Sequence, residues 1–201
     1  MLDNSSLAAL FGDVPLMAIL RGMGAERTLA VATAAWDLGI TSVEVPVQTP
    51  DDVEALRVLA DAAKERGLTV GAGTVVSVEH VRQAADAGAS FTVSPGFDLE
   101  VVQASHDAGM PALPGVATAT DVQLAMKSGL TWLKAFPASL LGPGWFKAMS
   151  GPFTQVNFVA TGGMDSTNAA QYLDAGVRVV AVGSALEDSA QLPALASLLR
   201  A

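Results

Sequence analysis

The stretch DAGASFTVSPGFDLEVVQASHDAG, residues 86–109, carries the pattern that decides the fold. Its short apolar run at 91–94 predicts a buried strand, and apolar residues at helical spacing follow before a second Asp-Ala-Gly. Glycine permits the left-handed backbone conformation that ends many helices. The stretch therefore predicts one strand–helix unit that ends at a glycine.

The same unit repeats along the chain. Asp-Ala-Gly returns at 174–176, and glycines at predicted helix-to-strand junctions are Gly39, Gly67, Gly88, Gly109, Gly129, Gly151 and Gly176. These junctions separate eight predicted strands, at about 15–21, 41–46, 69–74, 91–94, 112–114, 131–136, 156–160 and 178–183.

Strands that alternate with helices at this pitch indicate an α/β fold with a parallel sheet. Eight units predict a (β/α)₈ TIM barrel, with an open doubly wound sheet as the alternative. Residues 4–11 predict a short N-terminal helix that covers the bottom of the barrel. No composition shift or linker divides the chain, so residues 1–201 are predicted to form one domain.

Composition excludes several classes of function. The net charge of −9 disfavours partners such as nucleic acid or an anionic membrane, and no apolar run approaches the ~18 residues that span a bilayer. The absence of cysteine excludes disulfides and thiolate catalysis. The N-terminus has no signal-peptide pattern, so we expect a cytoplasmic protein.

Lys134 is the residue that most directly suggests a chemistry. It lies in the apolar run Thr131–Pro137, whereas Lys64, Lys127 and Lys147 lie in polar or helical segments. Burial lowers the pKa of a lysine and makes it an amine nucleophile that can form a Schiff base with a ketone. The alternative is a lysine that extends to solvent or closes a structural ion pair.

Other polar residues also fall at predicted strand ends, where barrels place their catalytic groups. These are Arg21 at the end of the first strand, Glu44 in the second and Thr74 at the end of the third. Each has a structural alternative: a solvated strand end, an ion-pair partner, or a helix cap. Together with Lys134 they form an amine, a carboxylate and an Arg/Thr pair that can hold a small carboxylate.

A second group of residues predicts a phosphate site. Thr161-Gly162-Gly163 follows the seventh predicted strand, and Gly183-Ser184 ends the eighth. Asp165-Ser166 is predicted to open the next helix. The loops after strands 7 and 8 of barrels often bind phosphate through backbone N–H groups. Ordinary turn glycines are the alternative.

Nearly the whole chain resembles the bacterial 2-keto-3-deoxy-6-phosphogluconate/6-phosphogalactonate aldolases, which are class I pyruvate aldolases. The matching runs are AILRG at 18–22, VEVPVQTP at 43–50, GAGTV at 71–75, SPG at 94–96, PGVATATD at 114–121, LKAFPA at 133–138, TGG at 161–163 and VGS at 182–184. The family fold is a (β/α)₈ barrel, usually assembled as a trimer. The resemblance therefore implies that the protein is a carbon–carbon lyase. It also implies that the protein forms a homotrimer.

The resemblance also implies roles for individual residues. Lys134 would form the Schiff base and Glu44 would act as acid and base. The substrate-binding residues would be Arg21 and Thr74 for the pyruvate carboxylate, Gly162, Gly163 and Ser184 for the 6-phosphate, and Pro95, Phe136 and Gly183 beside them. The partners would be a phosphorylated keto-deoxy sugar acid, pyruvate and glyceraldehyde 3-phosphate. No organic cofactor is expected, because the lysine itself supplies the electrophile.

One segment favours the phosphogalactonate branch of the family. Residues 46–50, Pro-Val-Gln-Thr-Pro, resemble the Pro-Leu-Asn-Ser-Pro of that branch more than the Leu-Arg-Thr of the phosphogluconate branch, as do ATATD at 117–121 and LLGPGWFKAM at 140–149. Gln48 is therefore predicted to read the C4 hydroxyl of the sugar. A phosphogluconate-specific or dual-specificity enzyme is the alternative.

Two rival functions use the same barrel. In a phosphate-binding isomerase or synthase, Lys134 would only contact the substrate, and a sugar-phosphate sensor would bind without turnover. His80 and His106 lie in helical segments among polar neighbours and are predicted to be surface residues. They are far apart in the sequence, so we expect no metal site.

Overall fold

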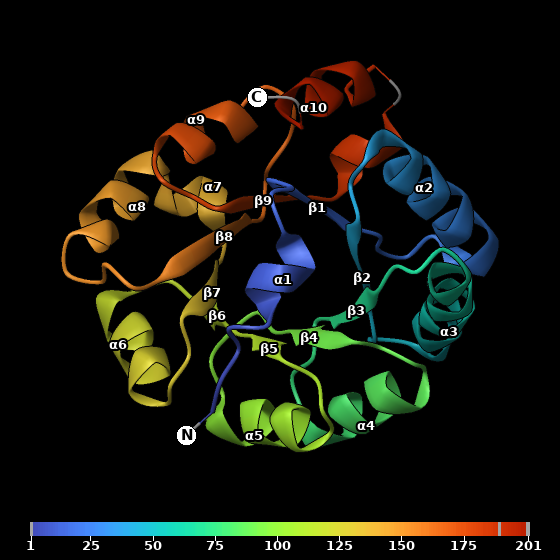
Figure 1. Ribbon diagram of the computed structural model, residues 1–201, viewed down its shortest axis with the longest axis horizontal. Coiled ribbons are helices and arrows are strands. Elements are labelled where there is room, and N and C mark those ends of the chain that lie inside the picture. The colour runs from blue at the N-terminus through green and yellow to red at the C-terminus, as the bar shows by residue number, and fades with distance from the viewer. Residues whose placement is uncertain (1, 189, 200–201) are drawn as a thin grey trace.

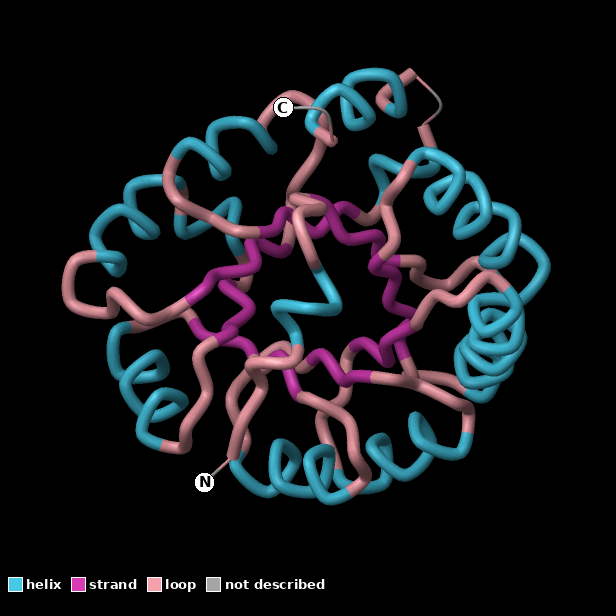
Figure 2. The backbone as a smooth tube through the Cα atoms, in the orientation of Figure 1, coloured by secondary structure: helices cyan, strands magenta, loops and turns pink. Residues whose placement is uncertain are grey.

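The sheet forms a ring surrounded by helices (Figure 1; Figure 2). The computed structural model describes residues 2–188 and 190–199. In this part of the chain the strands, paired in parallel, are β1 Leu16–Ile19, β2 Ser42–Pro46, β3 Val70–Gly73, β4 Phe91–Val93, β5 Ala112–Leu113, β6 Gly115–Val116, β7 Trp132–Ala135, β8 Asn157–Thr161 and β9 Val179–Val182. The predicted α/β fold with a parallel sheet is confirmed.

The helices follow the strands around the outside of the ring. They are α2 Gly24–Leu38, α3 Pro50–Glu65, α4 Val78–Asp86, α5 Leu99–Asp107, α6 Ala119–Lys127, α7 Ala138–Leu141, α8 Pro143–Ser150, α9 Ala169–Asp174, the 3₁₀ turn η1 Ser184–Glu187 and α10 Leu192–Leu198. None of the helices in the described ranges is both long and apolar enough to cross a membrane.

Over residues 2–188 and 190–199 the sheet has nine strands where the sequence predicted eight. Its order, β5-β4-β3-β2-β1-β9-β8-β7-β6, begins and ends at strands that only Pro114 separates in the chain. Proline has no N–H to donate to a ladder, so the predicted strand at 112–114 becomes two short strands. The Pro114 carbonyl still accepts a hydrogen bond from the Lys134 N–H at 2.9 Å. The sheet is therefore nearly closed, unlike the open alternative.

Junction glycines take the expected conformation at six of the seven predicted positions. Gly39, for example, has φ of 98° directly after α2. Gly151 is the exception, because its φ of −63° after α8 is right-handed. A turn at 151–155 rather than a left-handed cap therefore leads from α8 to β8.

The short helix α1, Leu7–Phe11, closes one end of the ring and lies at its centre in Figure 1. Phe11 stacks at a tilt on Trp132, with 5.1 Å between the ring centroids. Both belong to the apolar cluster inside the ring, while a larger cluster fills the space between strands and helices. The predicted N-terminal helix is confirmed, although it begins at residue 7 rather than 4.

Asn4 links strands at this end of the ring, near the break between β5 and β6, through hydrogen bonds of its side chain. Its amide nitrogen donates to the carbonyls of Ala112 and Trp132 at 2.9 and 2.8 Å. Its amide oxygen accepts from the N–H groups of Thr131 and Trp132 at 3.0 and 3.2 Å. One fully buried side chain thus joins the start of β5 to the start of β7.

Asn4→Ala is therefore expected to destabilise the protein. The substitution leaves buried backbone groups without partners, and each such loss typically costs about 1–3 kcal/mol. Chemical denaturation should show the lower free energy of unfolding. Ser6→Ala is the matched control, because the exposed Ser6 makes no side-chain capping bond to α1. Equal stability of the two variants would contradict the role of Asn4.

Candidate active site

The carboxyl-terminal ends of the strands surround a cavity of about 450 Å³ at the end opposite α1. Nine of the eleven predicted site residues line it: Arg21, Thr74, Pro95, Lys134, Phe136, Gly162, Gly163, Gly183 and Ser184. Glu44 and Gln48 are the two that do not. The structure therefore brings together residues that lie as far apart as 21 and 184 in the chain.

Lys134 points inward from β7 and is only 4% exposed, whereas the other three lysines are exposed. Its Nζ lies 5.3 Å from the centre of the Phe136 ring. Burial lowers the pKa of the Lys134 ammonium below its ordinary value, and the charge of Arg21 adds to this, while Glu44 opposes it. The environment therefore favours the neutral, nucleophilic amine.

Glu44 lies on β2, does not line the cavity and is 0% exposed. Neither carboxylate oxygen has a hydrogen-bond partner in the described part of the chain. Burial raises the pKa of the Glu44 carboxyl, and the positive charges of Lys134 and Arg21 only partly oppose this. The two shifts bring the pKa values of the Glu44 carboxyl and the Lys134 ammonium closer together, which makes it easier for the pair to exchange a proton through a substrate.

Glycine at position 73 makes room for this carboxyl group. A Cβ atom at Gly73 would lie 2.8 Å from Oε1 of Glu44, closer than real side chains approach. Gly115 likewise leaves space for the backbone at Pro95, because a Cβ atom at Gly115 would lie 2.1 Å from the Pro95 carbonyl oxygen. These two glycines therefore allow Glu44 and Pro95 to approach the site.

Arg21 lies at the rim with two acceptors from neighbouring strand ends. Its guanidinium donates to the amide oxygen of Gln48 and, at 3.3 Å, to the hydroxyl of Thr74. Thr74 has φ of 57°, the only positive φ of a non-glycine residue in the described ranges. Such a conformation is costly for a β-branched residue and is found where surrounding structure holds it for function. Thr74 does not cap α4, since Ser77 does so.

The predicted phosphate loops face the same cavity. Gly162 and Gly163 have φ of 99° and 73°, so both use backbone conformations that suit glycine. The Gly163 carbonyl accepts from the amide of Asn168 at 2.9 Å. The following helix α9 begins at Ala169, not at Asp165-Ser166 as predicted, because residues 166–168 form a turn. The loop glycines and Ser184, rather than a helix start at 165, therefore face the cavity.

Four further residues line the cavity: Ile19, Thr161, Met164 and Ala181. Thr161 belongs to the predicted phosphate loop but was given no role of its own, and the other three were not predicted. Thr161 matters most, because it is 3% exposed and its hydroxyl has no hydrogen-bond partner among the described residues. It ends β8 directly before the two glycines, a position that signals a site in a barrel. Its buried hydroxyl group is therefore left without a hydrogen-bond partner from the described residues, in a residue that lines the cavity.

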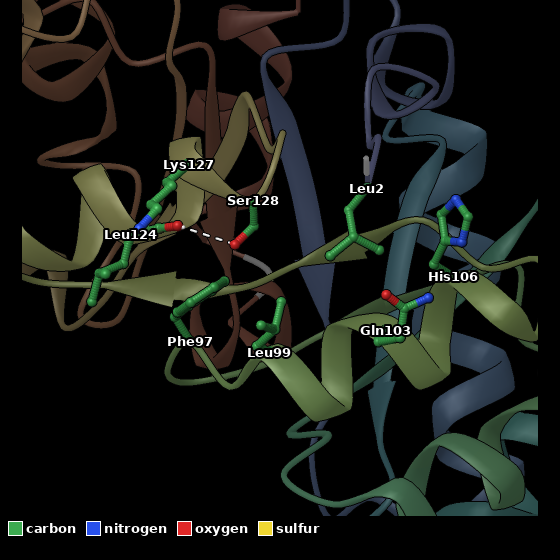
Figure 3. A pocket seen from close by; sticks show the side chains of 8 residues that line it. All are labelled: Leu2, Phe97, Leu99, Gln103, His106, Leu124, Lys127 and Ser128. Atoms are coloured by element: carbon green, nitrogen blue, oxygen red, sulfur yellow. Dashed lines mark hydrogen bonds between the residues drawn. The ribbon is translucent and has the colours of Figure 1, made fainter.

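A larger cavity of about 720 Å³ lies elsewhere, between α5 and α6 (Figure 3). Its lining residues are Leu2, Phe97, Leu99, Gln103, His106, Leu124, Lys127 and Ser128. His106 and Lys127 are exposed there and lack the buried acid–base pairing of the strand-end cavity.

The two histidines lie apart from the strand-end cavity. His106 is exposed, as predicted, whereas His80 is half-buried. Nδ1 of His80 accepts a hydrogen bond from the Val76 N–H at 3.4 Å, which draws its ring toward the loop before α4. Within the described ranges no group of three or more His, Asp or Glu residues could hold a metal ion.

Comparison with known proteins now identifies the family. The family model for KDPG and KHG aldolase matches residues 8–197. The chain belongs to this aldolase family. It is 36% identical to 2-dehydro-3-deoxy-6-phosphogalactonate aldolase of Escherichia coli K12, over 89% of this chain and 87% of that one. It is 40% identical to 2-dehydro-3-deoxy-phosphogluconate aldolase of Treponema pallidum, over 79% and 74%.

A solved aldolase has the same fold and a relevant intermediate. The structure of KDPG aldolase from Legionella pneumophila, with pyruvate captured at low pH as a covalent carbinolamine, matches with a TM-score of 0.82 and 31% identity. The match covers 96% of this chain and 95% of that one. The predicted aldolase family and lyase class are thus confirmed, while the roles of the individual site residues stay predictions.

Proposed function

We propose that the chain is a class I aldolase that cleaves 2-dehydro-3-deoxy-6-phosphogalactonate to pyruvate and D-glyceraldehyde 3-phosphate through a Schiff base on Lys134. The observation that carries this proposal is a buried lysine with a lowered pKa that lines the cavity and is electrostatically coupled to the buried carboxyl group of Glu44, which has no hydrogen-bond partner among the described residues. We also propose that β5 and β6 act as one interrupted strand, so that residues 1–201 form a single eight-position barrel.

The proposed reaction begins with attack of the neutral Lys134 amine on the C2 ketone. Glu44, directly or through a water molecule, supplies and removes protons while the carbinolamine loses water to give a protonated imine. The uncharged carboxyl favoured by the raised pKa of Glu44 is the form that can donate a proton in this step. The protonated imine then serves as the electron sink.

Carbon–carbon cleavage follows from the same two residues. Glu44 as carboxylate removes the C4 hydroxyl proton, the C3–C4 bond breaks, and its electron pair moves into the imine to give an enamine. Glyceraldehyde 3-phosphate leaves, C3 of the enamine is protonated, and water hydrolyses the pyruvate imine to free the lysine. The chemistry uses groups of the chain, the substrate and water, so the proposal includes no organic cofactor.

The rest of the cavity supports the proposed substrate. Arg21 and Thr74 would hold the carboxylate, while Gly162, Gly163 and Ser184 at the other side of the cavity would hold the 6-phosphate. The Pro46–Pro50 segment favours the galacto epimer. Similarity alone does not decide between the epimers, since relatives of both kinds match over most of the chain.

Two measurements test the function. Borohydride reduction in the presence of pyruvate should add one pyruvate-derived group to the protein, which a barrel isomerase or a sensor would not show. Initial rates of pyruvate release from the two C4-epimeric 6-phosphates, measured side by side, should be higher for the galacto epimer. Faster release from the gluco epimer would overturn the proposed specificity while keeping the aldolase mechanism.

Ser184→Ala is expected to raise KM for the phosphorylated substrate. Ser184 is an exposed residue that lines the cavity beside Gly183, and the loss of one hydrogen bond to a charged group costs roughly 1.5–3 kcal/mol. Steady-state kinetics with the substrate and its analogue without phosphate should show the effect only for the former. Equal effects on both would place the phosphate site elsewhere. Ser150→Ala, on the exposed end of α8, is the matched control.

We also propose a cytoplasmic homotrimer. Exposed leucines support self-association: Leu99 is 53% exposed and Leu124 is 48% exposed, both at the outer cavity of Figure 3. Large exposed apolar side chains that gather on one face commonly mark a protein interface. Analytical ultracentrifugation would show a species of three chains, and a monomer at all concentrations would exclude it.

A further inference from the structure

We infer that Gln48 is a positioning residue that holds Arg21 with an uncharged acceptor, leaving the positive charge of Arg21 available for the carboxylate of the pyruvyl group. The inference rests on the proposed function for the identity of that carboxylate. It differs from the expectation that Gln48 reads the C4 hydroxyl, because here Gln48 acts through another residue.

The first support is where the Gln48 side chain lies. Gln48 is exposed and does not line the strand-end cavity, whereas Arg21 and Thr74 do. The amide oxygen of Gln48 accepts a hydrogen bond from Nη1 of Arg21, and the Thr74 hydroxyl accepts from Nη2. The contact of Gln48 with the site therefore passes through the Arg21 guanidinium.

The backbone around Gln48 is fixed on both sides. The Val47 N–H donates to the Gly73 carbonyl at 3.0 Å, which continues the pairing of β2 with β3. Thr49 forms a capping box with Asp52: its hydroxyl accepts from the Asp52 N–H at 3.2 Å, and its own N–H donates to the Asp52 carboxylate at 3.1 Å. Gln48 is thus presented to Arg21 from an ordered strand-to-helix turn, which limits the entropy lost on forming the contact.

The second support is the charge of the acceptors. Arginine is long and flexible, so orienting its planar guanidinium for a carboxylate needs acceptors on the groups that do not face the ligand. An aspartate or glutamate in this position would orient Arg21 equally well but would neutralise it. Gln48 and Thr74 are both uncharged, and no ion pair of Arg21 is found among the described residues.

The test measures pyruvate binding apart from cleavage. Borohydride trapping is followed by mass spectrometry as a function of pyruvate concentration in the wild type, Gln48→Leu, Gln48→Glu, Arg21→Met and the Arg21→Met/Gln48→Leu double variant. Gln48→Leu should raise the half-saturating pyruvate concentration about 3- to 10-fold, the net worth of one hydrogen bond, with full trapping at saturation. Gln48→Glu should raise it further, because the new carboxylate competes for Arg21.

The double variant tests whether the effect of Gln48 on pyruvate binding depends on Arg21. If Gln48 acts through Arg21, Gln48→Leu should cause no further change once Arg21 is methionine. The same increase with and without Arg21 would overturn the inference, as would an unchanged half-saturation in both single variants of Gln48. Gln123→Leu, at an exposed position of α6, is the matched control and should behave as the wild type.

The same measurements distinguish a positioning role of Gln48 from direct recognition of the sugar and from a failure of the Schiff-base mechanism. Gln48→Leu could leave the half-saturating pyruvate concentration normal and yet lower the ratio of kcat/KM between the C4 epimers. This result would show that Gln48 contacts the sugar directly instead of orienting Arg21. If borohydride trapped no pyruvate on the wild-type protein, the proposed Schiff-base mechanism itself would be contradicted.

Discussion

Lys134→Ala is expected to abolish cleavage of the keto-deoxy sugar acid while leaving a folded protein. The amine is the proposed nucleophile, and the other three lysines are exposed and do not line the strand-end cavity. Water cannot replace the imine as electron sink, so activity should fall to the limit of detection in a pyruvate-release assay. Lys134→Met fills more of the space left by the side chain and should be equally inactive.

Peptide mapping gives the complementary result for the wild-type protein. Treatment with pyruvate and borohydride should place the added group on the peptide that contains Lys134. Lys127→Ala is the matched control, since this exposed lysine lies on α6 and its removal should change neither trapping nor turnover. Labelling of Lys64, Lys127 or Lys147 in place of Lys134 would contradict the assignment.

Glu44→Gln is expected to lower kcat by about 10²-fold or more, the usual worth of a general acid–base group. Glutamine has nearly the same shape, and the Glu44 carboxyl oxygens have no hydrogen-bond partner among the described residues, so the fold should change little. Trapping with pyruvate should be slowed but not lost, because Lys134 remains. Steady-state rates near those of the wild type would show that another group transfers the protons.

The pH dependence of trapping gives an independent check on Glu44. The neutral amine reacts, so the trapping rate should rise with pH through the pKa of Lys134, which lies below its ordinary value of 10.5. The Glu44 charge opposes that decrease in pKa. Removing it should therefore move the rise to lower pH in Glu44→Gln. Glu65→Gln, at the exposed end of α3, should leave the pH profile unchanged. A profile for Glu44→Gln that matches the wild type would show that Glu44 does not act on Lys134.

The sequence alone determined the fold class and most of the site. Apolar runs and junction glycines predict the parallel α/β arrangement, since a strand that is buried on both faces must be apolar throughout. A charged residue inside such a run, like Lys134, is then conspicuous. Strand-end positions led to nine residues that the structure places around one cavity.

Only the tertiary structure decided which groups meet and in what state. Pro114 is visible in the sequence, but the pairing of β5 with β4 and of β6 with β7 on its two sides depends on strands that are distant in the chain. The buried Glu44 carboxyl fits beside β3 because Gly73 on that adjacent strand leaves space for it. Gln48 contacts Arg21 across 27 residues, and Thr161 faces the cavity without a partner. Sequence fixes periodicity and residue chemistry, whereas burial, pKa and pairing depend on neighbours that are distant in the chain.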